Sequence, residues 1–352
     1  MNVLLIVPSN DNVGPVNVVK YLTKANSNDE VKFTVLCLRK KSDFIFENCR
    51  TLFVPNFRIP FLSLLWIRKF LKSNKFDICH SHGFFPDMYN YVCKVLSFNC
   101  LKSLSTVHNY PDEDYPMEYG KLKGFWLSKF HYFLLKKLTS VIGCSSSVSQ
   151  HLHCKNIECT TIRNGVSIVG LHDSIAISIN YDLKPVRLFF LGRLIKRKNF
   201  SELATFFLNA KLDFHEKYSL TVCGNGPEFE YYNDLLSPFQ NIKFMGHVDN
   251  PASYILDSDI LVSTSLAEGF PLSVLEAILV GKRSLLSNIE PHLELKAFLG
   301  DAIECYQLGS KDDFLNKLDI LSNRRLDPQS KATYLASATR MFNEYISLYR
   351  SI

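Results

Sequence analysis

The 352-residue sequence has no run of about twenty apolar residues, so it lacks a segment that would cross a membrane as a helix. Its first residues, MNVLLIVP, have no basic region before a long apolar stretch, and they predict a buried strand and not a signal peptide. The ten cysteines show no repeated spacing and no CxxC pair, which predicts free thiols in a reducing cytoplasm. The chain also has no low-complexity segment, no short repeat, and no recognition-helix or zinc module of a nucleic-acid binder.

The composition is that of an ordinary globular protein, with 47% hydrophobic and 21% charged residues, and the length predicts two domains. Phenylalanine is abundant, at 27 residues, which fits either a bulky core or apolar surface kept for a membrane or a hydrophobic substrate. Residues 1–165 carry 21 basic and 12 acidic side chains, a net charge of +9, so the remainder carries −3. A basic first half is compatible with nucleic acid, an anionic membrane or a phosphorylated substrate.

Short apolar runs alternate with helical patterns in both halves of the chain. The strand-like runs are Val3–Val7, Lys32–Cys37, Ile78–His80, Ser103–Val107 and Ser140–Cys144, and then Val186–Leu191, Ser219–Cys223, Ile242–Phe244, Ile260–Ser263 and Arg283–Leu286. This alternation predicts two doubly wound parallel-sheet domains that bind ligands beyond the carboxyl ends of their strands. We expect an N-terminal domain over 1–166, a linker over 167–183, a C-terminal domain over 184–331, and a final amphipathic helix within 332–352.

The most informative segment is SLAEGFPLSVLEA, residues 265–277, which follows a predicted strand. Gly269 permits a tight turn, Pro271 suits the first helical turn, and the free amides at the helix start favour an anion such as diphosphate. Glu268 and Glu276 are placed to accept hydrogen bonds from hydroxyls at two ends of one ligand. A capped helix with solvated glutamates fits the same pattern.

A second segment, FLGRLIKRKN at residues 190–199, leaves a strand and enters a helix. A transferase that releases a nucleoside diphosphate must offset the negative charge that grows on the leaving group, and arginine and lysine supply fixed cations for this. Taken alone, the run Lys196–Lys198 is equally compatible with a solvated basic turn.

Together these segments resemble glycosyltransferase family 4, a retaining family with the GT-B fold of two Rossmann-like domains facing a cleft. Glu268 and Glu276 match its EX7E motif. Arg193 and Lys198 match its G-R-L-x-x-x-K signature, in which Asn199 replaces the commoner glycine. The stretches at 224–227 (GNGP) and 246–248 (GHV) are similar to the family's G-x-G-P turn and its base-contacting loop.

The resemblance implies roles for these residues. Glu268 would contact the donor sugar, Glu276 the ribose, and Arg193 with Lys198 the diphosphate, while backbone amides of 270–273 face the diphosphate and sugar. The full set of implied donor-binding residues is Gly14, Arg193, Lys198, Asn225, His247, Val248, Glu268, Gly269, Phe270, Pro271, Leu272, Ser273 and Glu276.

The N-terminal half carries weaker matches to the same family. The segments at 77–83 (DICHSHG) and 106–109 (TVHN) resemble its D-V-V-H-x-H and T-x-H-D segments, and imply that His108 contacts the donor sugar or helps position the acceptor. His80 and His82 are more readily structural. The first loop keeps one glycine, Gly14, and lacks the family's glutamate, which leaves the acceptor side undefined.

Two groups of potential metal ligands are present, but neither predicts a metal site. Asp257-Ser258-Asp259 matches the D-x-D motif of the other large glycosyltransferase fold, yet it lies just before the EX7E segment. The cluster His151, His153, Cys154 and Cys159 fits no common zinc spacing. We therefore expect no metal and no cofactor beyond the nucleotide-sugar substrate.

Two segments of the basic half mix aromatic and basic side chains, namely Phe61–Lys72 and Lys121–Lys137. Each is compatible with a helix lying on an anionic membrane and equally with a core helix whose lysines are solvated. The sequence leaves both interpretations open.

The sequence thus predicts a metal-independent retaining glycosyltransferase that moves a hexose or N-acetylhexosamine from a nucleotide-diphosphate sugar to a hydroxyl of a lipid-linked glycan. The setting implied by the resemblance is surface polysaccharide synthesis, such as O-antigen or lipopolysaccharide, in the cytoplasm at the inner face of the membrane and without nucleic acid. A nucleotide-sugar epimerase of the same architecture and a non-catalytic nucleotide-sugar or nucleic-acid binding protein are the alternatives.

Overall fold

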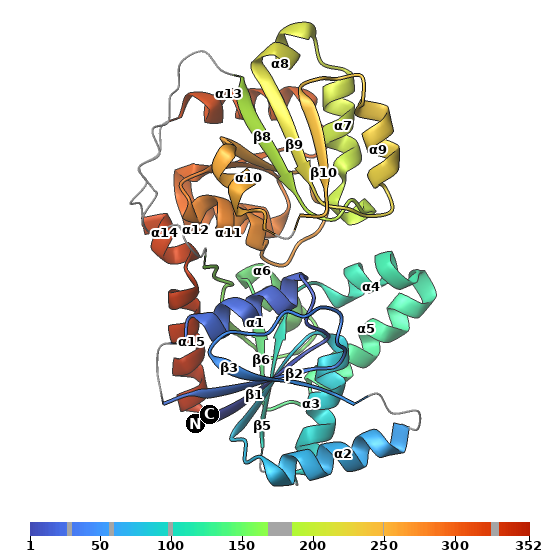
Figure 1. Ribbon diagram of the computed structural model, residues 1–352, viewed down its shortest axis with the longest axis vertical. Coiled ribbons are helices and arrows are strands. Elements are labelled where there is room, and N and C mark those ends of the chain that lie inside the picture. The colour runs from blue at the N-terminus through green and yellow to red at the C-terminus, as the bar shows by residue number, and fades with distance from the viewer. Residues whose placement is uncertain (27–29, 56–59, 98–100, 168–184, 249, 325–330) are drawn as a thin grey trace. The chain divides into compact units, whose positions relative to one another are not determined.

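The computed structural model describes residues 1–26, 30–55, 60–97, 101–167, 185–248, 250–324 and 331–352. It divides into two compact units (Figure 1). Unit 1 comprises Met1–Gly165 with Ala338–Ile352, and unit 2 comprises Val166–Ser337. Apart from Ser167, the predicted linker lies outside the described residues.

Unit 1 is built on a seven-stranded parallel sheet in the order β3-β2-β1-β4-β5-β6-β7. Its strands are β1 (Asn2–Val7), β2 (Lys32–Cys37), β3 (Cys49–Phe53), β4 (Ile78–His82), β5 (Lys102–Val107), β6 (Ser140–Gly143) and β7 (Thr160–Thr161). The continuous apolar run of β1 is fully buried, as expected for a central strand covered on both faces. The strand order reverses between β1 and β4, which is where ligands bind in such sheets.

Helices cover both faces of this sheet: α1 (Gly14–Lys24), α2 (Pro60–Ser73), α3 (Phe84–Leu96), α4 (Pro111–Tyr119), α5 (Lys121–Leu135), α6 (Ser146–Cys154) and α15 (Ala338–Ser351). The last of these comes from the far end of the chain. Its buried Tyr345 and Tyr349 bond through their hydroxyls to Thr106 Oγ1 at 2.8 Å and His80 Nδ1 at 2.6 Å. The C-terminal helix is therefore an integral part of unit 1.

Unit 2 holds a six-stranded parallel sheet in the order β10-β9-β8-β11-β12-β13. The strands are β8 (Val186–Leu191), β9 (Tyr218–Cys223), β10 (Ile242–Gly246), β11 (Ile260–Ser263), β12 (Arg283–Ser287) and β13 (Ile303–Tyr306). Its helices are η1 (Lys196–Lys198), α7 (Phe200–Leu208), α8 (Leu212–Lys217), α9 (Phe229–Leu236), α10 (Ala252–Asp257), α11 (Leu272–Leu279), α12 (Glu290–Leu299), η2 (Gly300–Ala302), α13 (Lys311–Asn323) and α14 (Lys331–Ala336). Phe190, Phe200, Phe207 and Phe314 lie fully buried in its core, so a bulky core explains much of the phenylalanine content.

The structure differs from the sequence-based expectation at the sheet edges and near the C-terminus. The missed strands β3, β7 and β13 are all edge strands, where a short or half-exposed strand gives a weak apolar signal. Where the sequence predicts one helix within 332–352, the structure has α14 and α15, separated at Ser337. There the backbone forms an isolated parallel bridge with Val166, which a continuous helix would prevent.

Candidate functional site

In unit 2, four loops meet at the carboxyl edge of the sheet because they follow the adjacent parallel strands β10, β9, β8 and β11. Backbone hydrogen bonds join each loop to its neighbour: Gly192 N to Cys223 O (3.0 Å), Leu194 N to Asn225 O (3.1 Å), Gly224 N to Gly246 O (2.7 Å) and Leu266 N to Arg197 O (2.8 Å). The predicted motifs at 190–199, 224–227, 246–248 and 265–277 are thereby brought to the point between β8 and β11 where the strand order reverses.

The glycines of the GNGP turn are required by close packing. Gly224 and Gly226 have φ angles of +146° and +158°, a range that other residues rarely adopt. A Cβ at Gly224 would lie 1.8 Å from the carbonyl oxygen of Gly192, and a Cβ at Gly226 would lie 2.4 Å from that of Leu194. Only glycine lets this turn lie against the basic loop.

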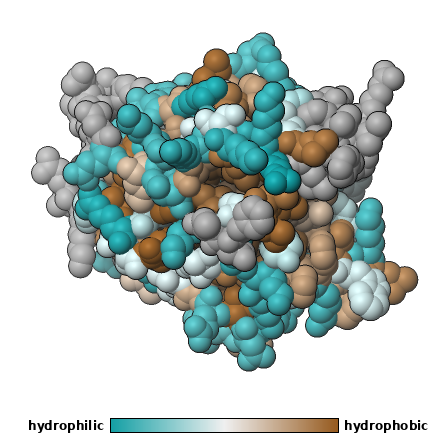
Figure 2. Space-filling model, turned by 90° about the horizontal axis from the view of Figure 1, so that it is seen from below, coloured by the Kyte–Doolittle hydropathy of each residue, from teal (hydrophilic) through white to brown (hydrophobic). Residues whose placement is uncertain are grey.

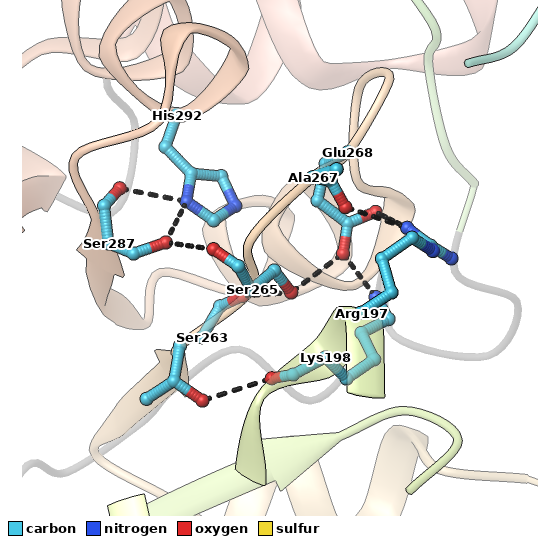
Figure 3. Close-up of polar contacts among 9 residues, drawn as sticks. Arg197, Lys198, Ser263, Ser265, Ala267, Glu268, Ser287 and His292 are labelled. Carbon is cyan, nitrogen blue, oxygen red and sulfur yellow. Dashed lines mark hydrogen bonds and ion pairs between the residues drawn. The ribbon is translucent and has the colours of Figure 1, made fainter. Parts of the chain in front are cut away.

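Glu268 is the centre of the site. Its carboxylate is buried, at 6% exposure, and accepts hydrogen bonds from Lys198 Nζ (2.5 Å), Arg197 Nη1 (3.0 Å) and Ser265 Oγ (2.8 Å). Figure 3 shows the two cations reaching Glu268 from one side and Ser265 from the other. Burial by itself would raise the pKa of Glu268, but the charges of Lys198 and Arg197 outweigh burial and hold the pKa well below its ordinary value. The carboxylate is therefore ionised at physiological pH.

Local backbone features aim Lys198 at this carboxylate. Gly192 has no side chain where Lys198 passes, since a Cβ there would lie 3.3 Å from Lys198 Cε. Thr264 Oγ1 donates to the carbonyl oxygens of Lys198 (3.1 Å) and Asn199 (2.9 Å). Asn199 adopts the left-handed conformation, with φ +50°, which asparagine tolerates best after glycine, so its replacement of the family's glycine is conservative.

A second layer of polar side chains supports the loop that carries Glu268. Ser287 Oγ donates to Ser265 O at 2.6 Å, and His292 Nδ1 donates to Ser287 O at 2.9 Å (Figure 3). Because a carbonyl oxygen only accepts, the proton of the neutral ring lies on Nδ1. His292 is completely buried, and this burial lowers its pKa to about 4, so the ring is neutral at pH 7.

The other predicted donor-binding residues of unit 2 lie in the turn before α11, in α11 itself and on the adjoining loops. Gly269, Phe270 and Pro271 are buried in the turn before α11. Leu272 and Ser273 form the first turn of α11, and Glu276, half-buried, lies one turn further along. Arg193, Asn225 and His247 are exposed on the adjoining loops, with Val248 half-buried beside them. This part of the sequence-based set therefore lies on the hydrogen-bonded loops at the carboxyl edge of the unit 2 sheet and in α11.

The remaining predicted residues, Gly14 and His108, belong to unit 1. Gly14 begins α1 just after β1, and His108 follows β5. His108 Nε2 lies 2.9 Å from Nδ1 of the buried His82. His80, also buried, bonds through Nε2 to Thr106 Oγ1 at 2.8 Å and, as above, to Tyr349. His80 is thus a structural link to α15, as the sequence favours.

The buried histidines make the stability of both units sensitive to acid. Burial lowers the pKa of His80 to about 3 and that of His292 to about 4, whereas a histidine in the unfolded chain titrates near 6.5. Between these values the unfolded chain binds more protons, so stability falls as the pH falls. We expect His80 and His292 each to contribute a loss of about 2 kcal/mol between pH 7.5 and pH 5, at ~1.4 kcal/mol per pH unit below 6.5. Burial also lowers the pKa of His82 and His108, so these two histidines add to the loss in unit 1.

Urea unfolding at the two pH values measures this loss. His292→Gln should reduce the pH dependence of unit 2, because it removes the buried ring whose pKa is lowered there. Equal stability of wild type at pH 7.5 and pH 5 would contradict the expectation.

Three of the potential metal ligands, Asp257, Asp259 and His151, are engaged in other contacts. Asp259 accepts hydrogen bonds from Arg187 Nε at 3.2 Å and Nη2 at 3.1 Å, and Asp257 lies 3.7 Å from the same guanidinium. His151 Nε2 lies 2.7 Å from Asp112 Oδ1. No group of three or more histidine, cysteine or acidic residues in the described part of the chain is arranged to hold a metal ion.

The sequence motifs predict no individual role for Arg197, Ser265 or His292. Arg197 contacts both the Glu268 carboxylate and the Ala267 carbonyl oxygen, at 3.0 and 2.8 Å. It lies between two lysines, and the sequence of three consecutive cations does not show which side chain points toward Glu268. The role of His292 depends on tertiary packing, because α12 comes after another strand, whereas the contact of Ser265 with Glu268 is local to the loop after β11.

Family models match both halves of the chain. Residues 14–169 match the model described as Glycosyltransferase Family 4, and residues 174–330 match that described as Glycosyl transferases group 1. Among individual proteins, the O-antigen biosynthesis glycosyltransferase WclY of Escherichia coli is 25% identical over the full length of both chains. An Escherichia coli UDP-Gal:alpha-D-GlcNAc-diphosphoundecaprenol alpha-1,3-galactosyltransferase is 27% identical over 83% of this chain and 80% of its own.

Solved structures share the fold. Anabaena Alr3699/HepE in complex with UDP and glucose superposes with a TM-score of 0.76 at 11% identity, covering 99% of each chain. The lipopolysaccharide outer core galactosyltransferase WaaB superposes with a TM-score of 0.66 at 17% identity, covering both chains completely. The two parallel-sheet units thus have the GT-B fold.

Proposed function

Because this chain belongs to the family 4 glycosyltransferases and its relatives act in polysaccharide synthesis, we propose that it transfers a hexose or N-acetylhexosamine from a nucleoside-diphosphate sugar to a glycan hydroxyl. The observation that carries this proposal is the buried Glu268 carboxylate, held by two cations at the carboxyl edge of the unit 2 sheet. The Glu268 carboxylate can accept a hydrogen bond from a hydroxyl of the donor sugar, and the neighbouring cations supply positive charge for the diphosphate.

The proposed reaction retains the anomeric configuration. The acceptor hydroxyl attacks the anomeric carbon on the face from which the diphosphate leaves, forming the new glycosidic bond as the bond to the phosphate oxygen breaks. The hydroxyl proton passes to the departing phosphate. Arg193, Lys198 and the amides at the start of α11 stabilise the leaving group, Glu268 orients the donor sugar, and Glu276 binds the ribose.

Two relatives suggest the substrates. One is named for a UDP-galactose donor and a diphosphoundecaprenol-linked acceptor, and a structural neighbour holds UDP and glucose. We propose a UDP-sugar donor and a polyprenyl-diphosphate-linked glycan acceptor at the inner face of the cytoplasmic membrane. We propose that His108 and Gly14, both in unit 1, also bind substrate. No metal takes part, because Lys198 and Arg193 supply the charge.

Thermal unfolding with a panel of UDP- and GDP-sugars in EDTA tests the donor site. We expect one nucleotide class to stabilise the wild type. Glu276→Ala should weaken that binding about 10- to 100-fold, since a hydrogen bond from a ligand to a charged group contributes about 1.5–3 kcal/mol. The matched control is Glu216→Ala, at an exposed position on α8, which should bind as the wild type does.

Several outcomes would contradict the proposal. Stabilisation that appears only without EDTA would argue against a metal-free site. Equal donor binding by wild type and Glu276→Ala would contradict the proposed contact between Glu276 and the ribose. Conversion of the donor to its epimer without acceptor would favour the epimerase alternative. No stabilisation by any nucleotide sugar, at millimolar concentration and with acceptor present, would favour a non-catalytic binding protein.

A further inference from the structure

The helical hairpin formed by α4 and α5 leaves one face of α5 uncovered. Figure 1 shows the two helices side by side at the edge of unit 1, near α3. The large apolar side chains exposed along α5 are Leu122 (82%), Phe125 (48%), Trp126 (69%), Phe130 (43%) and Phe133 (50%). At 100° per residue, Leu122, Trp126 and Phe133 form the middle of one stripe, opposite the buried Gly124, Ser128 and His131. A row of exposed aromatics this long marks an interaction surface.

Lysines flank this stripe on both sides. Lys121, Lys123 and Lys129 lie on α5, and Lys136 and Lys137 follow it, all exposed. The helix itself has no acidic residue, and the acids of the hairpin are on α4. Lys129 and Lys137 lie over the rings of Phe125 and Phe133, at 5.4 and 5.5 Å from their centroids. Aromatic side chains between flexible cations are typical of a helix lying in a membrane interface.

The opposite face of α5 is fixed to unit 1. Gly124 packs so closely on α4 that a Cβ would lie 2.3 Å from Pro116 N. The buried His131 bonds through Nε2 to Asp87 of α3 at 2.6 Å and through Nδ1 to the Tyr115 hydroxyl at 2.8 Å. Tyr132 bonds to Asp112 of α4 at 2.7 Å. These contacts hold the hairpin in one orientation, so its aromatic face is presented rigidly.

The other aromatic and basic helix, α2, is packed differently. Its Ile67 and Phe70 belong to the core of unit 1, and Trp66 stacks on Phe70 with ring centroids 5.1 Å apart. Of its described side chains, Leu65, Arg68, Lys69, Lys72 and Ser73 are exposed. The two segments therefore differ in their described side chains: α2 contributes Ile67 and Phe70 to the core and exposes one leucine besides its cations, whereas α5 exposes a row of aromatic rings. In Figure 2, which views the molecule from below, hydrophobic groups reach the surface among hydrophilic ones.

We propose that the exposed face of α5 docks on an anionic phospholipid bilayer. Its lysines complement lipid phosphates, while Trp126 and Phe133 insert at the level of the headgroups. A symmetric pair of chains meeting through this face would bring lysines against lysines, which disfavours a second copy as the occupant. No helix in the described ranges is long and apolar enough to span a bilayer, and docking needs none. The inference rests on the proposed function, since a lipid-linked acceptor is reached at such a surface.

The two tryptophans of the chain allow a direct test. Trp66→Phe leaves Trp126 on α5 as the sole reporter, and Trp126→Phe leaves Trp66 on α2. Each protein is titrated with vesicles of phosphatidylglycerol and phosphatidylcholine, and with pure phosphatidylcholine. We expect a blue shift of Trp126 fluorescence with anionic vesicles, weakened by salt, and none of Trp66. Lys123→Glu/Lys129→Glu should lower vesicle affinity at least 10-fold, whereas Lys69→Glu/Lys72→Glu on α2 should lower it less than 3-fold.

The proposal would be overturned if anionic vesicles did not shift the fluorescence of Trp126, or if they shifted the fluorescence of Trp66 and Trp126 equally. It would also be overturned if the fluorescence of Trp126 shifted with protein concentration in the absence of vesicles, which would indicate that a second copy of the chain binds this face. Nucleotide-sugar binding is measured on the same variants. Unchanged donor binding without vesicle binding would refute the docking surface alone. Vesicle binding without donor binding would refute the proposed function and leave the surface standing.

Discussion

Lys198→Ala is expected to lower the kcat of sugar transfer about 10²- to 10³-fold, as removal of one preorganised donor to a developing oxyanion does. Lys198 is largely buried, and its Nζ is held at the Glu268 carboxylate before any ligand arrives. Its charge is therefore in place when negative charge grows on the diphosphate, and little reorganisation is needed. Because the effect falls on the transition state, KM should change much less than kcat. Steady-state transfer assays with a saturating acceptor measure both.

Lys196→Ala is the matched control, since Lys196 lies in the same turn with the same charge but is exposed. It should change kcat less than twofold. If Lys198→Ala kept its kcat and lost only thermal stability, Lys198 would be a counter-ion of Glu268 with no part in the reaction. Donor binding by Lys198→Ala, measured in the same preparation, shows whether the site is still formed.

The central strands and the neighbouring positions of the donor motifs can both be predicted from the sequence, because both follow from the pattern of a parallel sheet. Val186–Leu191 and Ile260–Ser263 are strands with the predicted limits, since central parallel strands buried on both faces appear as short apolar runs. The loops that follow them must lie at one edge of the sheet, so motifs spaced about 70 residues apart could be placed together. Glycine pairs such as Gly224 and Gly226 mark the turns that permit this approach.

What the sequence could not give depends on tertiary contacts. Edge strand β13 carries Glu304, whose charge interrupts the apolar signal and which the fold pairs with Lys296 and Arg324. Arg197 could not be told from its neighbouring lysines, because only the position of the loop after β11 turns it toward Glu268. The sequences of α2 and α5 are similar mixtures of aromatic and basic residues, and tertiary packing decides which of these side chains are buried.

Glu268→Ala is expected to destabilise unit 2 by about 3 kcal/mol and to abolish transfer. The substitution leaves the largely buried Lys198 and Arg197 without their carboxylate, and breaking a buried ion pair costs about 3–5 kcal/mol because the remaining charge is uncompensated. The folded-state pKa of Glu268 is lowered, so its stabilisation is complete above the unfolded value near 4.5 and is lost only in stronger acid. The difference between wild type and Glu268→Ala should therefore be constant from pH 5 to pH 8.

A double-mutant cycle separates the ion pair from simple loss of packing. Glu268→Ala/Lys198→Ala removes one of the uncompensated cations, so it should be destabilised less than the sum of the two single variants, by about 1 kcal/mol or more. Additive destabilisation in urea would mean that the 2.5 Å contact contributes nothing to stability. Activity should not recover in the double variant, because both the acceptor for the sugar hydroxyl and the cation for the diphosphate are then missing. Recovery of stability without recovery of transfer is the combination expected of a charge pair that is kept for catalysis.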